Sequence, residues 1–80
     1  MQVLIRGLPR DVTESMLQEK LRDRAPVRSV EIVRDGDPEH PWAWIDLDID
    51  RVAAWRLLRQ FDRQSFNGSV MRWYIPMHQE

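Results

Sequence analysis

The sequence contains no cysteine, which excludes disulfide bonds, thiolate metal sites and thiol nucleophiles. Long apolar runs are missing as well. The longest run near the start, Val3 to Ile5, ends at Arg6 and is too short for a signal peptide or a membrane span. We therefore expect a soluble intracellular protein, cytoplasmic or nuclear, that has no membrane partner.

Neither acidic nor basic residues predominate, because the formal net charge is only −1. Lysine is nearly absent, and every basic residue except Lys20 is arginine. The planar guanidinium group stacks on rings and binds phosphate through paired hydrogen bonds, so this bias favours recognition of phosphates or bases. The balanced overall charge argues against a surface that holds nucleic acid by electrostatics alone.

A chain of 80 residues can form one domain with a modest core, and we expect a single domain over residues 1–80. Alternating apolar residues predict four strands, over 2–8, 27–34, 40–48 and 69–76. Apolar residues at helical spacing predict two helices, over 11–25 and 50–61. Thr13 and Asp50 are the expected N-caps of these helices, and Pro26 is expected to end the first of them.

The order strand, helix, strand, strand, helix, strand predicts an α+β fold. The economical arrangement is a ferredoxin-like sandwich, in which a four-stranded antiparallel sheet carries both helices on one face and leaves the other face open. The expected core combines the strand residues that point toward the helices with the apolar faces of the helices: Val3, Ile5, Leu8, Leu17, Leu21, Val30, Ile32, Ala43, Ile45, Leu47, Ala54, Leu57, Leu58, Phe61, Met71 and Trp73.

The stretch HPWAWIDLD in the third predicted strand indicates what the open face carries. Period-two alternation sends the compact residues Ala43, Ile45 and Leu47 to one face. The same alternation sends Trp42 and Trp44 to the other face, together with an acidic residue that does not belong in a core. Exposed indole rings have a cost in stability and solubility, so this pair is best explained as a binding surface.

Two segments of the sequence resemble the motifs of a known family. The segment VLIRGL, residues 3–8, resembles the hexamer on the first strand of the RNA recognition motif, and HPWAWIDL, residues 40–47, resembles its octamer on the third strand. The spacing between the two is typical of the family, and the resemblance covers the whole chain. It implies the fold given above, a non-catalytic module that binds single-stranded RNA on an aromatic sheet face, and no cofactor.

The resemblance also implies a set of RNA-binding residues. The third and fifth octamer positions are Trp42 and Trp44, on which bases are expected to stack. The second hexamer position, normally aromatic, is Leu4, and Tyr74 on the last strand is the candidate replacement for the missing ring. The first octamer position, normally Lys or Arg, is His40, so phosphate binding there is expected to be weak.

Two arginines are the candidate cations of the open face. Arg6 and Arg72 are both expected there, where they would contact phosphates or base edges. The alternative is that they form surface ion pairs with Glu31 or Asp46. Pro41 replaces the octamer's glycine and cannot donate a ladder hydrogen bond, which is tolerable at the start of a strand.

The second predicted helix offers a weaker set of candidates. Arg51, Arg56, Arg59 and Arg63 lie mostly on its solvent side, and a charged helix face is usually only solvated. Trp55 falls at the margin of the apolar face, where partial burial is expected.

The sequence leaves a second function open, in which the same fold binds a protein partner. The acidic loop DGDPE beside the tryptophans favours this alternative, because carboxylates repel phosphates. Single-stranded DNA is kept as an alternative to RNA, and a monomer is expected. Catalysis is not expected, since Asn67 is the one asparagine and lies in a late turn, and no metal site is expected, since His40 and His78 lack ligand-like spacing.

Overall fold

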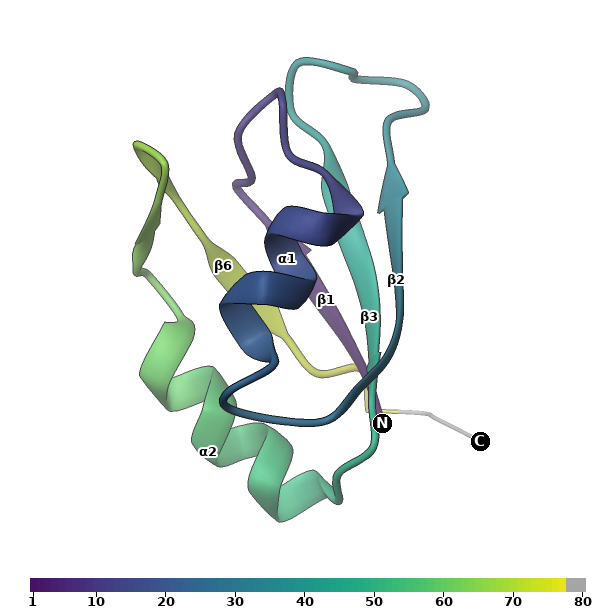
Figure 1. Ribbon diagram of the computed structural model, residues 1–80. Helices are drawn as coiled ribbons and strands as arrows, with labels where there is room; N and C mark the ends of the chain where they lie inside the picture. Colours follow the sequence, from purple (N-terminus) through teal and green to yellow (C-terminus); the bar gives the residue numbers. More distant parts are fainter. Residues whose placement is uncertain (78–80) are drawn as a thin grey trace.

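The computed structural model in Figure 1 describes residues 1–77. Its elements follow the chain as β1 (Gln2–Arg6), α1 (Glu14–Leu21), β2 (Val27–Val33), β3 (Trp42–Leu47), α2 (Arg51–Phe61), β4 (Ser65–Phe66), β5 (Ser69–Val70) and β6 (Arg72–Tyr74). Strands β2, β3, β1 and β6 form one sheet in that spatial order, and every neighbouring pair is antiparallel. The predicted α+β class and four-stranded sheet are therefore confirmed.

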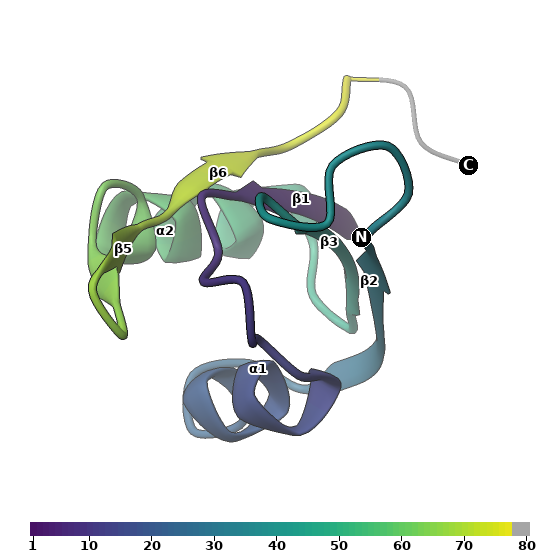
Figure 2. The ribbon, with the colours of Figure 1, turned by 90° about the horizontal axis from the view of Figure 1, so that it is seen from above.

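Both helices lie on the same side of this sheet, as the views in Figures 1 and 2 show. The cause is the period-two alternation of the central strands. Val3 and Ile5 on β1 and Ala43 and Ile45 on β3 are fully buried against the helices, while their immediate neighbours point the other way and remain partly exposed. The opposite face of the sheet is thus left without a covering layer of helices.

The buried core agrees closely with the expected one. All but three of the expected residues are buried, and the exceptions, Val30, Ile32 and Leu58, are only partly buried although they pack against the core. Val30 and Ile32 lie on β2, which is an outer strand of the sheet and has a neighbour on one side only. Further buried residues, not in the expected core, lie outside the predicted periodic segments or near their ends: Pro9, Val12, Ala25, Pro41 and Phe66.

The helix starts agree with the sequence, but the end of α1 does not. The Thr13 hydroxyl accepts a hydrogen bond from the Met16 amide at 3.2 Å, and the Asp50 carboxylate accepts one from the Ala53 amide at 2.8 Å. The expectation that Pro26 ends α1 is wrong, because the helix already ends at Leu21. The charged residues that follow turn away from the core, and the Leu21 carbonyl closes this turn by accepting from the amides of residues 24 and 25.

The predicted last strand is divided in two. Residues 65–66 and 69–70 form the β4–β5 hairpin, which turns at Asn67 and Gly68, both with positive φ, and only residues 72–74 join the main sheet. At Gly7, where φ is +75°, the chain leaves β1 close to this hairpin. A Cβ atom on Gly7 would clash with the Val70 carbonyl oxygen, so the glycine allows β1 and the hairpin to approach each other.

Trp73 is buried, as expected, and it anchors β6 to α2. Its ring is buried and stacks on Phe61 of α2, with a centroid separation of 5.5 Å and an interplanar angle of 16°. The Asp62 carboxylate, just after α2, accepts a hydrogen bond from the Trp73 amide at 2.9 Å. The last strand is therefore fixed both by a ring contact and by a side-chain hydrogen bond to its backbone.

Candidate nucleic-acid interface

The strand register places four side chains in one row across the open face of the sheet. Trp44 pairs with Glu31 on one side and with Leu4 on the other, and Leu4 pairs in turn with Tyr74. All four point away from the helices, because the residues next to them in β1, β3 and β6 are buried. The candidate site residues Trp44, Leu4 and Tyr74 are thus neighbours on three adjacent strands.

Trp42 lies beside Trp44 on the same face of β3. The two rings are 5.8 Å apart at their centroids and meet edge to face at 70°. Both side chains are partly buried, so part of each remains accessible to solvent. The sequence predicted this face for both tryptophans, and the structure places them there.

Arg6 and Arg72 lie directly opposite each other where β1 pairs with β6. Their environments differ. The Nε of Arg72 is 3.5 Å from Asp62, so its charge is partly compensated, whereas the guanidinium of Arg6 lies over the Trp42 ring at 5.9 Å. Within residues 1–77, Arg6 has no carboxylate partner, and it is the cation best placed to meet an anionic ligand on the tryptophans.

The alternative ion pairs considered for these arginines are not those in the structure. Neither Arg6 nor Arg72 pairs with Glu31 or Asp46 in the described part of the chain. Asp46 instead lies 3.3 Å from the N-terminal amine. The partner of Arg72, Asp62, comes directly after α2 and not from a strand of the sheet.

A shallow hollow occupies the β1–β6 end of this surface. It has a volume of about 430 Å³ and is lined by Leu4, Arg6, Tyr74, Ile75 and Pro76. Leu4, which occupies the motif position that is normally aromatic, contributes to the apolar lining of this hollow. Ile75 and Pro76 were not among the predicted site residues, and the one sequence signal for them is that Pro76 stops the strand and makes the chain leave the sheet.

His40 lies apart from the other candidate residues. It is exposed in the loop between β2 and β3, and its Nδ1 is 3.0 Å from the Asp37 carboxylate. The next residue, Pro41, is buried immediately before β3 begins, so its missing amide does not interrupt the described ladder. The structure therefore brings six of the seven candidates onto or beside one sheet face and leaves His40 in a loop.

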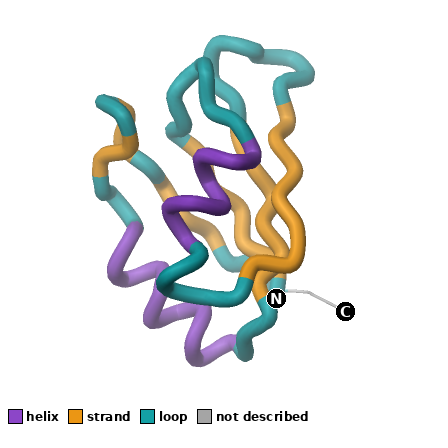
Figure 3. Tube along the Cα trace, viewed as in Figure 1, coloured by secondary structure: helices purple, strands orange, loops and turns teal. Residues whose placement is uncertain are grey.

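The β2–β3 loop is held against the β1–α1 loop at one end of the sheet, where Figure 3 shows the two loops together. The Arg34 guanidinium donates to the carbonyl oxygens of Arg10, at 2.7 Å, and of Val12. Arg10 in turn lies 3.3 Å from Glu39. These contacts hold the β2–β3 loop, which leads directly into Trp42, and Arg10 compensates part of its negative charge.

Two further findings concern membranes and metals. No helix in the described residues is long and apolar enough to cross a bilayer. Across residues 1–77, no three histidine, aspartate or glutamate side chains are grouped in a way that would hold a metal ion. His78, the second histidine considered in the sequence, lies outside the described residues.

Comparisons with known families and with solved structures agree with each other. The sequence model of the family described as RNA recognition motif matches residues 3–72. Among solved structures, Pes4 RRM3 has a TM-score of 0.82 at 14% identity, and the alignment covers 99% of this chain and 94% of that one. The second RRM domain of the yeast poly(U)-binding protein Pub1 has a TM-score of 0.78 at 15% identity, covering 99% and 96%.

A third similar structure is titled as the Rna15 RRM with bound RNA (GU). It has a TM-score of 0.78 at 15% identity, covering 99% of this chain and 85% of that one. At such low identities these structural matches show a shared fold. No curated protein matches the sequence significantly.

Proposed function

Because this chain belongs to the RNA recognition motif family, we propose that it binds single-stranded RNA on the open face of its sheet. Domains of this family are in general non-catalytic RNA-binding modules. The observation that supports the proposal most strongly is the row of Trp44, Leu4 and Tyr74 on three adjacent strands, with Trp42 beside it. In this proposal residues 1–80 act as one monomeric domain, and no cofactor takes part.

Base stacking on the tryptophans supplies most of the binding free energy. A base stacked on an aromatic side chain contributes roughly 1 to 3 kcal/mol. Trp44 and Tyr74 are separated by two strand intervals, which corresponds to about 10 Å across the sheet. That separation suits two bases that lie on different rings rather than one base held between them, and the surface as a whole would accommodate two to four nucleotides.

The apolar hollow beside Leu4 accepts the part of the ligand that lies between the rings. Leu4 offers contact area but no π face, so a base or sugar there gains only apolar contact. Ile75 and Pro76 close the hollow at the β6 edge of the sheet. The replacement of an aromatic ring by Leu4 is therefore expected to lower the affinity rather than to prevent binding.

Arg6 provides the principal electrostatic contact. It lies over Trp42 without a carboxylate partner in the described chain, and a guanidinium group can bind phosphate oxygens in a bidentate manner. Arg72 contributes less, because Asp62 already compensates part of its charge. With so few cations on the face, we expect modest affinity and a shallow dependence on salt concentration.

Titration with a pool of randomised single-stranded RNA tests this proposal. Fluorescence anisotropy of labelled heptamers should show saturable binding that an unlabelled single-stranded pool displaces and a double-stranded RNA of equal length does not. A parallel DNA pool determines whether the 2′-hydroxyl groups contribute. Absence of binding at moderate salt, with the protein folded, would overturn the proposal.

A second candidate function is supported by one observation on the same face. Glu31 lies next to Trp44 in the row, and the β2–β3 loop that leads into Trp42 carries Asp35 and Asp37 besides the paired Glu39, so part of this surface repels phosphate. An RRM fold with such a surface would bind a peptide whose cationic side chains pair with these carboxylates. Binding of an arginine-containing peptide to the sheet face, together with no binding of RNA, would favour this function.

A further inference from the structure

A second surface with an unusual charge distribution lies on the helical side of the molecule. The segment after α1 passes beside α2 there, as Figure 1 shows, and two adjoining hollows lie between them. One is about 200 Å³ and the other about 380 Å³, and both are lined by Arg24 and Gln60. We call this surface the α1–α2 groove, and its remaining lining residues are Ala25, Ile49, Ala53, Arg56, Leu57, Arg59, Phe61 and Gln64.

Three arginines in the α1–α2 groove lack carboxylate partners. Arg24, Arg56 and Arg59 form no ion pair within residues 1–77, and neither hollow is lined by an acidic side chain. Elsewhere on the surface, Arg10, Arg22, Arg28 and Arg72 each pair with a carboxylate. Arg34 and Arg51 donate to backbone carbonyl oxygens, and Arg6 and Arg63 lie apart from one another without a carboxylate partner in the described residues. What distinguishes the groove is that three such arginines line the same two hollows with no acidic side chain among them, in a chain with slightly more acidic than basic residues.

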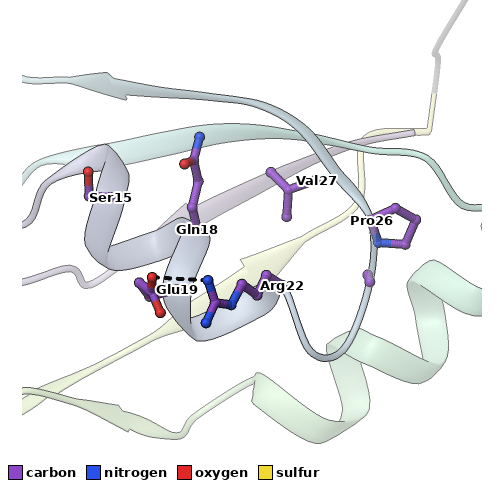
Figure 4. A pocket seen from close by; sticks show the side chains of 7 residues that line it. Ser15, Gln18, Glu19, Arg22, Pro26 and Val27 are labelled. Atoms are coloured by element: carbon purple, nitrogen blue, oxygen red, sulfur yellow. Dashed lines mark ion pairs between the residues drawn. The ribbon is translucent and has the colours of Figure 1, made fainter.

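A neighbouring hollow illustrates the difference. Figure 4 shows it between α1 and the start of β2, lined by Gln18, Glu19, Arg22 and others. Its one cation, Arg22, lies 3.3 Å from Glu19 within the hollow itself. That hollow therefore offers no net charge to a ligand, whereas the α1–α2 groove offers three positive charges.

The floor of the α1–α2 groove is aliphatic. Ala25 and Leu57 are buried, and Ile49 and Ala53 are partly buried beside them. The aromatic ring that reaches the groove, Phe61, is itself buried, with the Arg24 guanidinium 6.0 Å from its centroid. The groove thus combines an apolar floor with a cationic rim and offers no open ring for a base to stack on.

We propose that the α1–α2 groove binds an acidic peptide segment of a partner protein, with one aliphatic side chain on the floor and carboxylates on the rim. The forked guanidinium groups of Arg56 and Arg59 match carboxylate geometry, and their spacing of three residues places them on one face of α2. Nucleic acid is the less suitable occupant, because stacking on exposed rings contributes much of its binding and the groove lacks them. The groove faces away from the open side of the sheet, so both ligands can be bound together.

The test uses a twelve-residue peptide in which glutamates alternate with leucines, titrated into the ¹⁵N-labelled protein. Backbone amide shifts are expected at Ala53, Arg56 and Gln60, with no shift at Trp44. The double substitution Arg56→Glu with Arg59→Glu should weaken binding about tenfold or more, since it replaces attraction by repulsion. The control, Arg22→Glu with Arg28→Glu, makes the same change in net charge outside the groove and should leave the affinity within about twofold.

Two control peptides separate the contributions of the rim and the floor. Replacement of every glutamate by glutamine, or of every leucine by serine, should abolish binding at the groove. Binding that survives the groove substitutions, or that shifts the sheet residues instead, would overturn the proposal. So would groove shifts caused by a heptamer RNA, which would identify the site as a phosphate-backbone contact.

This outcome is independent of the sheet face. The Arg56→Glu, Arg59→Glu protein should bind randomised single-stranded RNA about as well as the unaltered protein. A protein that binds RNA but not the peptide would disprove the groove proposal alone. A protein that binds the peptide but not RNA would disprove the proposed function of the sheet.

Discussion

Trp44 and Leu4 lie directly opposite each other in the β1–β3 pairing, at the centre of the open face. An aromatic residue faces an aliphatic one here, although the family motif normally places an aromatic ring at both positions. The next strand carries Tyr74 opposite Leu4, so the row regains an aromatic ring one strand further along.

Trp44→Ala should remove most RNA binding at little cost in stability. The ring supplies a stacking surface, but it lies on the face away from the core, so its loss should lower the free energy of unfolding by only about 1 kcal/mol. Anisotropy with single-stranded RNA and urea unfolding measure the two effects. Trp55→Ala is the matched control, because that tryptophan is 47% exposed on α2 and should affect neither quantity.

Leu4→Phe should strengthen RNA binding. A phenyl ring at this position would place a third stacking surface between Trp44 and Tyr74, and stacking of one base corresponds to roughly 1 to 3 kcal/mol. We expect an increase in affinity of at least about fivefold, measured with the same RNA pool. Leu4→Met, which keeps the size but adds no ring, should leave the affinity unchanged, and an equal gain from both substitutions would contradict the stacking explanation.

Arg6→Gln should weaken RNA binding and reduce its salt dependence. If Arg6 contacts one phosphate of a single strand, the slope of log K against log salt should fall in magnitude by about 0.7. Arg72→Gln should have a smaller effect on both, because Asp62 already compensates its charge. Equal effects of the two substitutions would show that the ion pair with Asp62 does not matter in the bound state.

Trp73→Ala should destabilise the fold by about 3 to 5 kcal/mol. The ring is buried, stacks on Phe61 and belongs to the strand that closes the sheet. Urea unfolding measures the change, with Trp55→Ala as the control that should shift it by less than about 0.5 kcal/mol. A small effect would mean that the core does not depend on β6 in the way the structure indicates.

Gly7→Ala should be more destabilising than Gly36→Ala. Both glycines have positive φ, so alanine has a similar backbone cost at either position, about 1 to 2 kcal/mol. Only at Gly7 does the added Cβ also meet the Val70 carbonyl, while nothing lies near Gly36. Thermal unfolding of the two variants should show the larger loss at Gly7, and equal losses would argue against close contact between β1 and the hairpin.

The sequence predicted the faces of the central strands because burial there follows a strict period of two. Trp42 and Ala43 are neighbours in the chain, yet alternation alone assigns them correctly to opposite faces of the sheet. The N-caps were equally predictable, since Thr13 and Asp50 act on backbone amides within the next three residues. Features that depend on the local geometry of the chain, such as strand faces and helix N-caps, could thus be predicted from the sequence.

Features that depend on contacts between different elements of the fold could not be predicted in this way. The β4–β5 hairpin consists of two-residue strands, which are too short for an alternation pattern, and Phe66 is buried there without a periodic signal. Trp55 was expected to be partly buried, but it is exposed, because the buried face of α2 consists of Ala54, Leu57 and Phe61 and does not extend to it. The compensation of Arg72 by Asp62 arises only when α2 and β6 come together.

The most direct test of the account follows the four indole N–H signals in the ¹H–¹⁵N spectrum during titration with single-stranded RNA. Trp42 and Trp44 should shift in a saturable manner, while buried Trp73 and helical Trp55 should stay in place. Shifts at Trp55 or Trp73 without shifts at Trp42 and Trp44 would contradict RNA binding on the open sheet face.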